Sequence, residues 1–196
     1  IDRDGTLNVF RDGYIKEPEE WEPVPGALEA IALLNRSGWH VVVASNQPAL
    51  GRGVMDTATL NAIHAAMHKQ LAAVGARIDA VFFCPHSPDE ACNCRKPAPG
   101  LFLEIGERYG VELCEVHGVG DALRDVQAAA AAGCIPHLVC TGEGEQWLDR
   151  PLDDAFPPYT VKHSDLLAFA HYLIGQEPQP QEPGVQVPPG QGALAA

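Results

Sequence analysis

The sequence predicts an α/β protein with a doubly wound, mostly parallel, Rossmann-like sheet and helices on both of its faces. Short apolar runs alternate with amphipathic segments along most of the chain, and this alternation is typical of parallel strands joined by right-handed crossovers. The run 39–45 (WHVVVAS) is apolar at nearly every position, as expected for a strand that is buried on both faces. In addition, polar residues directly follow several of the runs, where such sheets place their functional groups.

The strands and helices can be assigned in order along the chain. Residues 1–4 follow the pattern of a strand end, although this first strand looks clipped, and PGALEAIALLNRSG (25–38) predicts a helix with Pro25 in its first turn and Gly38 at its end. The later expected elements are the strand 39–45, the helix 55–75, the strand 80–84, the helix 100–110, the strand 116–120, the helix 122–133, the strand 135–140, an edge strand at 159–162 and a closing helix at 163–175.

The helix predicted over 55–75 has a distinct apolar face. The residues that form it are Leu60, Ile63, Met67, Leu71 and Val74. His64 and His68 stand four residues apart on the same helix. Because no third ligand accompanies them, we interpret the two histidines as a polar helix edge rather than a metal site.

Length and composition limit the number of domains. A chain of 196 residues with 46% apolar and 20% charged residues has the size for one such core. We predict a single domain over residues 1–174, with no large cap domain, so that loops alone cover an open site. From Gly175 the sequence is rich in Pro, Gly and Gln, and we therefore predict a disordered tail over 175–196.

Charge and hydropathy exclude several classes of protein. Acidic residues outnumber basic ones 26 to 13, for a net charge of −13, which argues against an extended surface for nucleic acid. No apolar run approaches the roughly 18 residues of a membrane span, and we find no export signal at the start. We expect a cytoplasmic monomer that acts on a small molecule and binds neither nucleic acid nor membrane.

Polar residues stand where the predicted strands end. Asp2 and Asp4 end the first strand and are followed by a Gly that indicates a tight turn, Ser45 ends the second, Lys96 follows the third, and Asp121 follows the fourth. Because the carboxyl ends of parallel strands meet at one edge of the sheet, these side chains should converge.

This set of residues suits phosphoryl transfer. A carboxylate can attack phosphorus to form an aspartyl-phosphate, and a second acid two residues away can protonate the leaving oxygen and later activate water. Two carboxylates facing a phosphate require a cation, and Mg²⁺ prefers such oxygen ligands. A lysine and a hydroxyl can bind the remaining phosphate oxygens.

The segments DRDGT, SNQ, RKP and GDALRD, in this order, resemble the four motifs of the haloacid dehalogenase-like phosphatases, over the chain from its start to about Gly144. The resemblance implies that Asp2 is the nucleophile, Asp4 the general acid and base, Ser45 and Lys96 the phosphate-binding residues, Asp121 a Mg²⁺ ligand alongside Asp2 and the Asp4 carbonyl, and Asp125 a supporting residue.

The loop CPHSPDEACNCRKP holds a candidate zinc site. Cys84, His86, Cys92 and Cys94 have the spacing C-x-H-x₅-C-x-C, which provides the Cys₃His ligand set of a structural Zn²⁺. The alternative is a group of reduced thiols without a metal. We interpret the other cysteines, Cys114, Cys134 and Cys140, as small core residues.

The same resemblance narrows the substrate. The zinc loop, DRDGTLN and SNQPALGRG are similar to the branch of the family that removes the 7-phosphate of heptose 1,7-bisphosphates on the way to activated heptose for lipopolysaccharide; the neighbouring branch acts on histidinol phosphate. The resemblance implies substrate contacts from Arg3, Arg11, Asp12, Gly13, Tyr14, Asn46, Gln47, Pro48 and Arg95. A module that binds phosphate without turnover remains the alternative from another class, although the intact pair of Asp2 and Asp4 favours an enzyme.

Overall fold

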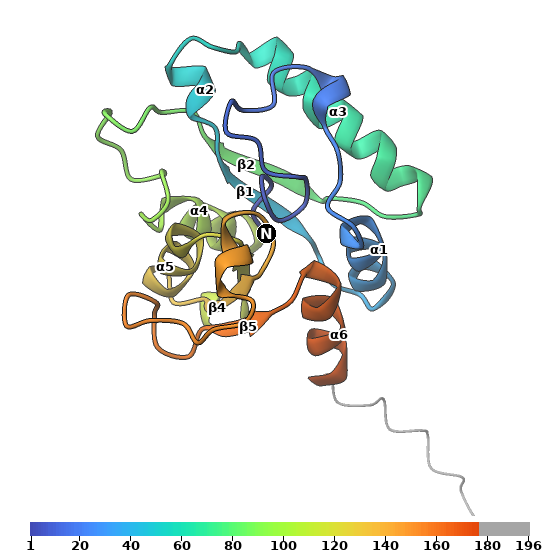
Figure 1. Cartoon of the computed structure of the whole chain (residues 1–196), viewed down its shortest axis with the longest axis vertical. Helices are drawn as coiled ribbons and strands as arrows, with labels where there is room; N and C mark the ends of the chain where they lie inside the picture. Colours follow the sequence, from blue (N-terminus) through green and yellow to red (C-terminus); the bar gives the residue numbers. More distant parts are fainter. Residues whose placement is uncertain (177–196) are drawn as a thin grey trace, which may run out of the picture.

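The computed structural model of the protein describes residues 1–176 (Figure 1). Gly175 and Gln176 belong to the last helix, α6 (Leu166–Gln176), so the predicted domain boundary after residue 174 falls inside this helix. The rest of the predicted tail lies outside the described residues. No helix among residues 1–176 is both long enough and apolar enough to cross a membrane.

Two groups of parallel strands form the sheet. β1 (Val42–Asn46) pairs with β2 (Ala80–Cys84). β4 (Ile135–Val139) lies between β3 (His117–Gly120) and β5 (Val161–His163).

The first residues of the chain join these two groups. The backbone N–H of Asp2 donates to the carbonyl of Val119 at 2.8 Å, and the N–H of Ala44 donates to the carbonyl of Ile1 at 2.8 Å. An extended segment at Ile1 and Asp2 therefore lies between β1 and β3, at the position expected for the first strand. The resulting order is β2, β1, the segment at residues 1–2, β3, β4 and β5.

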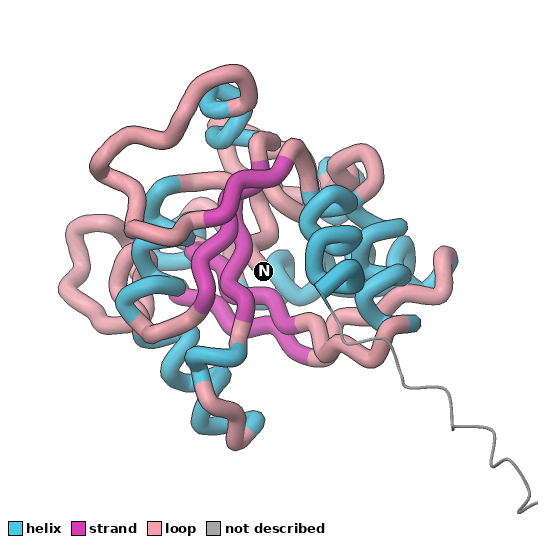
Figure 2. The backbone as a smooth tube through the Cα atoms, turned by 90° about the horizontal axis from the view of Figure 1, so that it is seen from below, coloured by secondary structure: helices cyan, strands magenta, loops and turns pink. Residues whose placement is uncertain are grey.

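Helices cover both faces of this sheet (Figure 2). α1 (Ala27–Arg36), α3 (Thr57–Ala73) and α6 share one large apolar core with residues of β1, β3 and β4. α4 (Gly100–Tyr109) and α5 (Leu123–Ala131) form smaller clusters on the opposite face. This arrangement confirms the predicted doubly wound α/β class.

Most element boundaries lie within a few residues of those predicted, and the differences have local causes. The strand expected at 39–45 begins only at Val42, because Trp39 still bonds to the carbonyl of Leu34 in the turn after α1. Short elements were not predicted. These are α2 (Pro48–Gly51) and the 3₁₀ helices Pro18–Glu20, Leu113–Glu115 and Gly142–Trp147.

Two predicted core positions are wrong. Val74 lies just past the end of α3 and is 40% exposed, whereas Leu60, Ile63, Met67 and Leu71 are fully buried as predicted. Cys114, in a 3₁₀ turn at the surface, is exposed, while Cys134 and Cys140 are buried. Apolar character alone therefore did not show that these two residues, at a helix end and in a surface turn, are exposed to solvent.

Candidate active site and metal cluster

Two glycines allow close contacts at the edge of the sheet where the strands end. Gly5 has φ +89°, and a side chain there would collide with the carboxylate of Asp121. A side chain at Gly120 would collide with Asp125. Gly5 therefore lets the turn after residue 4 approach Asp121, and Gly120 lets the end of β3 approach Asp125 on α5.

Lys96 lies at the centre of this edge between two carboxylates. Its Nζ lies 2.8 Å from Oδ1 of Asp2 and 2.6 Å from Oδ1 of Asp125, and it donates to the carbonyl of Ala44 at 2.8 Å. Burial disfavours the charged ammonium, but the carboxylates of Asp125 and Asp2 outweigh this effect and raise the pKa of Lys96. The lysine is therefore a fixed positive charge in the site.

The carboxylates around it are more numerous than its single charge can balance. Oxygen atoms of Asp2, Asp121 and Asp125 all lie within 4.8 Å of one another, and the three residues are buried. Burial raises the pKa of Asp2 to about 6, against the opposing effect of Lys96, with Asp125 and Asp4 raising it further. Burial and the neighbouring carboxylates of Asp125 and Asp2 also raise the pKa of Asp121 well above its usual value.

Asp121 and Asp125 are both held by hydrogen bonds. Asp121 accepts from the hydroxyl of Thr6 at 3.2 Å and from the backbone N–H of Glu143 at 2.8 Å. Asp125 accepts from the N–H of Ala122 at the start of α5 at 3.0 Å. Glu143 was not predicted, although it lies in the 3₁₀ helix that follows β4, at the same edge of the sheet. Asp125, expected as a supporting residue, presents its carboxylate to the cluster itself.

The side chain of Asp4 points to a different set of partners. Nη2 of Arg3 lies 2.9 Å from each of the Asp4 carboxylate oxygens, and Asn8 and Gln47 also donate to them, at 3.1 and 2.9 Å. Burial would raise the pKa of Asp4, but these partners, Arg3 first, lower it. The carboxylate of Asp4 is not part of the group formed by the other three acids.

The residues at the carboxyl end of β1 support this arrangement. The Nε2 of Gln47 donates to the buried hydroxyl of Ser45 at 2.8 Å as well as to Asp4. The amide of Asn46 accepts from the N–H of Lys96 and donates to its carbonyl, both at 3.0 Å. Asn46, expected to contact substrate, thus fixes the backbone of Lys96.

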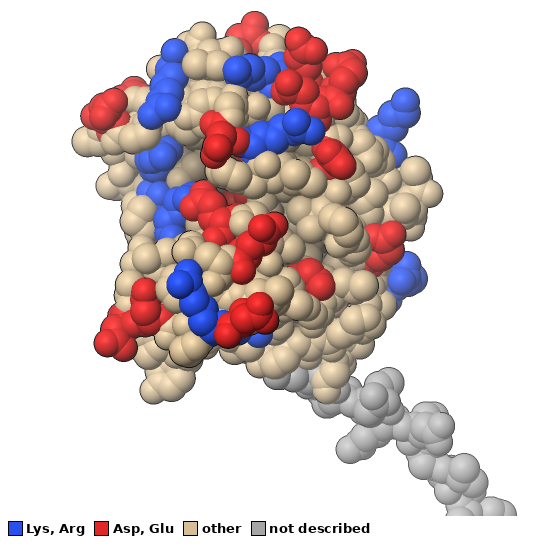
Figure 3. Space-filling view, in the orientation of Figure 1, with Lys and Arg blue, Asp and Glu red and all other residues tan. Residues whose placement is uncertain are grey.

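The other residues expected to contact substrate differ in their exposure. Arg11, Asp12 and Gly13 are exposed. Tyr14 has φ +64°, and its hydroxyl accepts a hydrogen bond from Nη1 of Arg52 at 2.7 Å. Pro48 is buried at the start of α2, and Nη1 of Arg95 donates to the carbonyl of His86 at 3.4 Å. On the face seen in Figure 3, basic and acidic side chains are interspersed. Arg3, in contrast, is only 1% exposed.

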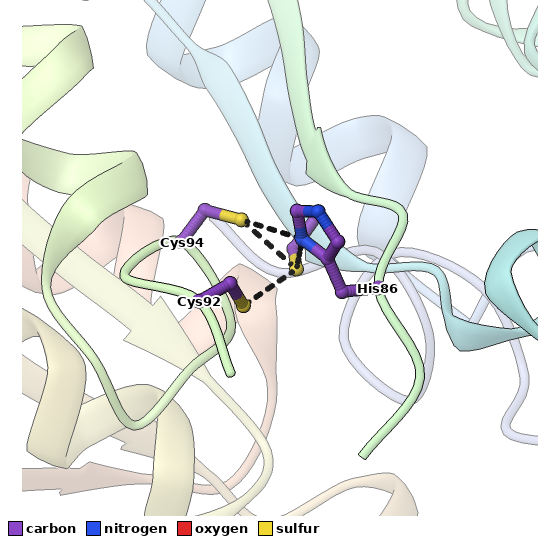
Figure 4. Close-up of side chains that lie close together, drawn as sticks. His86, Cys92 and Cys94 are labelled. Atoms are coloured by element: carbon purple, nitrogen blue, oxygen red, sulfur yellow. Dashed lines mark hydrogen bonds between the residues drawn. The ribbon is translucent and has the colours of Figure 1, made fainter. Parts of the chain in front are cut away.

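The four predicted zinc ligands come together at the end of β2 and in the loop that follows it (Figure 4). Nδ1 of His86 lies 3.4 Å from Sγ of Cys84 and 3.2 Å from Sγ of Cys94, and the Cys84 sulfur lies 3.7 Å from that of Cys92 and 3.1 Å from that of Cys94. A tetrahedral site with Zn–S bonds of about 2.3 Å has S–S edges of about 3.8 Å. The distance between Cys84 and Cys92 matches this edge, whereas that between Cys84 and Cys94 is shorter. All four ligand atoms lie within 4.8 Å of one another, so the group could hold a single metal ion.

The family of the chain is shown by comparison with known proteins. Residues 2–133 match the model of the haloacid dehalogenase-like hydrolases. The chain belongs to this family, which confirms the resemblance found in its four motifs, and its relatives are phosphoric monoester hydrolases.

Particular relatives carry a more specific name. The chain is 51% identical, over 89% of its length and 96% of the relative, to the D-glycero-beta-D-manno-heptose-1,7-bisphosphate 7-phosphatase of Bordetella bronchiseptica. It is 45% identical, over the same shares, to that of Pseudomonas aeruginosa. A crystal structure of the Bordetella bronchiseptica D,D-heptose 1,7-bisphosphate phosphatase complexed with magnesium and phosphate has a TM-score of 0.85, 50% identity, and covers 90% of this chain and 97% of that one.

Proposed function

We propose that this protein is a Mg²⁺-dependent phosphatase that removes the 7-phosphate of D-glycero-β-D-manno-heptose 1,7-bisphosphate. The observation that carries the chemistry is the convergence of Asp2, Lys96, Asp121 and Asp125 at one edge of the sheet. The names of relatives up to 51% identical support the substrate and its β anomer.

The residues at this edge fit a divalent cation. Three buried carboxylates face one lysine, which leaves an excess of about two negative charges in a buried site, and such an excess is costly unless it is balanced. In this proposal Asp2 and Asp121 bind Mg²⁺ through their carboxylates and Asp4 through its backbone carbonyl, with Asp125 beside them. When bound, the ion neutralises charge on the phosphate and on its attacking carboxylate.

The reaction then takes two displacements. In the first, a carboxylate oxygen of Asp2 bonds to phosphorus while the bond between phosphorus and the sugar oxygen breaks, and Asp4 gives its proton to that oxygen. In the second, Asp4 takes a proton from water, the water oxygen bonds to phosphorus, and the bond to Asp2 breaks to release phosphate. Lys96 and Ser45 bind the other phosphate oxygens throughout.

The outer loops select the rest of the substrate in this proposal. Arg11, Asp12, Gly13 and Tyr14 lie at the surface near one end of α2, and Arg95 lies next to the phosphate-binding Lys96. A sugar with a second phosphate presents hydroxyls and an anion to such a polar rim. Histidinol phosphate has neither the second phosphate nor the ring hydroxyls.

We also propose that Cys84, His86, Cys92 and Cys94 bind a structural Zn²⁺. Four protein ligands leave no open position for substrate, and the last ligand stands two residues before Lys96. We further propose that the protein acts as a cytoplasmic monomer without a nucleic-acid partner.

The substrate assignment is tested by comparing kcat/KM with Mg²⁺ for the β and α anomers of heptose 1,7-bisphosphate and for histidinol phosphate. We expect the β anomer to be the best substrate and histidinol phosphate to be slower by at least about 10²-fold. Histidinol phosphate lacks the sugar hydroxyls and the second phosphate, so polar groups of the pocket would be left unpaired. Faster turnover of histidinol phosphate would overturn the assignment but not the phosphatase chemistry. Absence of phosphate release from every phosphomonoester would favour a binding module.

A further inference from the structure

Arg3 is the largest side chain that is fully buried in the described part of the chain, at 1% exposure. A buried guanidinium is retained only where partners satisfy its charge and its donors. These partners therefore indicate what the residue does. At 1% exposure, Arg3 presents almost no open surface to a substrate.

The guanidinium of Arg3 forms an ion pair and several hydrogen bonds with the carboxylate of Asp4. Nε and Nη2 of Arg3 donate to Oδ1 at 3.2 and 2.9 Å, and Nη2 also reaches Oδ2 at 2.9 Å. Nη2 also donates to Oε1 of Gln47 at 3.2 Å, and the amide nitrogen of Gln47 in turn donates a hydrogen bond to the carboxylate of Asp4. Such multiple contacts fix orientation as well as charge. The side chain of Asp4 is 27% exposed, so part of it remains open to the crevice.

His64, on α3, contacts the remaining end of the guanidinium. Its Nε2 lies 3.4 Å from Nη1 of Arg3, and the residue is buried, which corrects its interpretation as a polar helix edge. The charged and titratable groups that face it are Arg3 and Asp4 from the opposing loop and His68 from its own helix. Burial, with Arg3 and His68, lowers the pKa of His64 to about 4, although Asp4 opposes this. A neutral ring can accept a hydrogen bond from Arg3.

We propose that Arg3 and His64 are positioning residues that orient the Asp4 carboxyl group toward the leaving oxygen of the substrate, and that Arg3 is not a substrate ligand. This inference rests on the role proposed above for Asp4 as general acid and base. Asp4 must meet both a leaving oxygen and a water molecule, and its partners Arg3, Asn8 and Gln47 fix it from the protein side. His64 fixes Arg3 in turn, so that the guanidinium keeps one orientation.

The leaving group distinguishes this role from a merely structural one. A primary alkyl phosphate such as glycerol 3-phosphate releases an alkoxide that needs a proton, whereas 4-nitrophenyl phosphate releases a stable phenolate that needs none. The ratio of kcat/KM for these two probes, measured with Mg²⁺ on one preparation, does not depend on how much of the protein is folded. The ratio thus reports proton donation and not stability.

The variants are Asp4→Asn, Arg3→Lys, His64→Leu and His64→Gln, with His68→Leu as control because His68 is exposed one turn further along α3. We expect Asp4→Asn to lower kcat/KM for the alkyl phosphate roughly 10²- to 10⁴-fold more than for the aryl phosphate. Arg3→Lys and His64→Leu should lower it selectively by roughly 10- to 100-fold, as a displaced catalytic group does. His64→Gln retains an acceptor and should recover most of the loss, and His68→Leu should match the parent.

The outcomes separate the two proposals. If Asp4→Asn changes the ratio but Arg3→Lys and His64→Leu do not, or if they lower both substrates equally, the positioning role is wrong and the proposed mechanism stands. If Asp4→Asn leaves the ratio unchanged, Asp4 is not the general acid and both proposals fall.

Discussion

At the scale of single residues, the site depends on which charges are paired with which. Lys96 pairs with Asp2 and Asp125, and Arg3 pairs with Asp4. The two acids of the DRDGT motif are thus separated, one facing the cluster of carboxylates and the other facing a guanidinium. Two neighbouring acids of the same type can take different roles when their environments differ in this way.

We expect Asp2→Asn to abolish turnover while the fold is retained. The amide has nearly the same volume as the carboxylate but cannot act as the nucleophile, and Lys96 keeps its second partner, Asp125. Phosphate release with Mg²⁺ and the melting temperature should be measured together. Substantial turnover by a pure preparation of this variant would exclude an aspartyl-phosphate at Asp2.

Asp125→Asn should raise the Mg²⁺ concentration needed for half-maximal rate, with little effect on the stability of the fold. The amide oxygen can still accept from the N–H of Ala122, but one of the three charges near the cation is lost, and loss of a residue that supports a metal ligand typically costs 10- to 100-fold in affinity or activity. The measurement is the Mg²⁺ concentration for half-maximal rate. The control is Asp56→Asn, which alters an exposed carboxylate that caps α3; equal responses from the two variants would contradict the prediction.

At the scale of elements, the loop between β2 and α4 links the cysteine cluster to the active site. Cys84 ends β2, Cys94 stands two residues before Lys96, and the backbone of Lys96 is bonded to the side chain of Asn46. The N–H of Gly100 at the start of α4 bonds to the carbonyl of Asn93 within the loop. Both ends of the loop are therefore attached to regular structure, and the cluster fixes the segment between them.

Replacing Cys92 with Ser should release zinc, loosen this loop and lower kcat/KM. Although burial opposes ionisation of Cys92, the N–H of Arg95 and the neighbouring thiols lower its pKa to about 7, which suits a metal-binding thiolate. The need for Mg²⁺ should persist because the acidic residues lie on other segments. Zinc content and kinetics should be measured on this variant and on Cys114→Ser, an exposed cysteine outside the cluster.

The two measurements test separate claims. Zinc loss with unchanged kcat/KM would show that the cluster does not support catalysis. Absence of zinc from the purified parent protein, together with parent-like activity after chelation, would show that the four residues do not bind it.

At the scale of the whole molecule, three histidines connect neighbouring strands beneath α6. Nδ1 of His117 on β3 lies 2.8 Å from Nε2 of His137 on β4, whose Nδ1 lies 3.0 Å from Nε2 of His163 on β5. The rings of Phe169 and Tyr172 from α6 pack against His137. The chain of imidazoles thus lies inside the layer that holds this helix on the sheet.

These histidines should make the fold sensitive to acid. Burial, followed by His117 and His163, lowers the pKa of His137 to about 3 from an ordinary value of 6.5, so at acidic pH the unfolded chain binds more protons than the folded one. The stabilisation is fully present above pH 6.5 and is lost as pH falls toward about 3, by up to about 1.4 kcal/mol per pH unit.

The test is the free energy of unfolding by urea between pH 7.5 and about 5, for the parent and for His137→Gln. We expect the parent to lose stability more steeply than the variant, because glutamine does not titrate, while other acid-sensitive groups are common to both. His171→Gln, which alters an exposed histidine of α6, should follow the parent. Parallel curves for the parent and His137→Gln would contradict the prediction.

The sequence by itself determined the fold class and predicted which residues meet at the edge of the sheet. Alternating apolar runs required buried parallel strands, and parallel strands place their carboxyl ends at one edge, so Asp2, Ser45, Lys96 and Asp121 could be assigned to that edge from the printed residues. The Cys₃His loop was equally visible because its ligands are close in sequence.

Only the tertiary structure decided which of these groups touch. The burial of Arg3, the contact of His64 with it and the bond from Glu143 to Asp121 join segments that no local pattern relates. Periodicity identifies the face that a helix buries, but not the polar residue of another segment that this face contacts. Which acid faces the lysine and which faces the arginine depends on side-chain packing across the whole site, and that is a property of the folded chain.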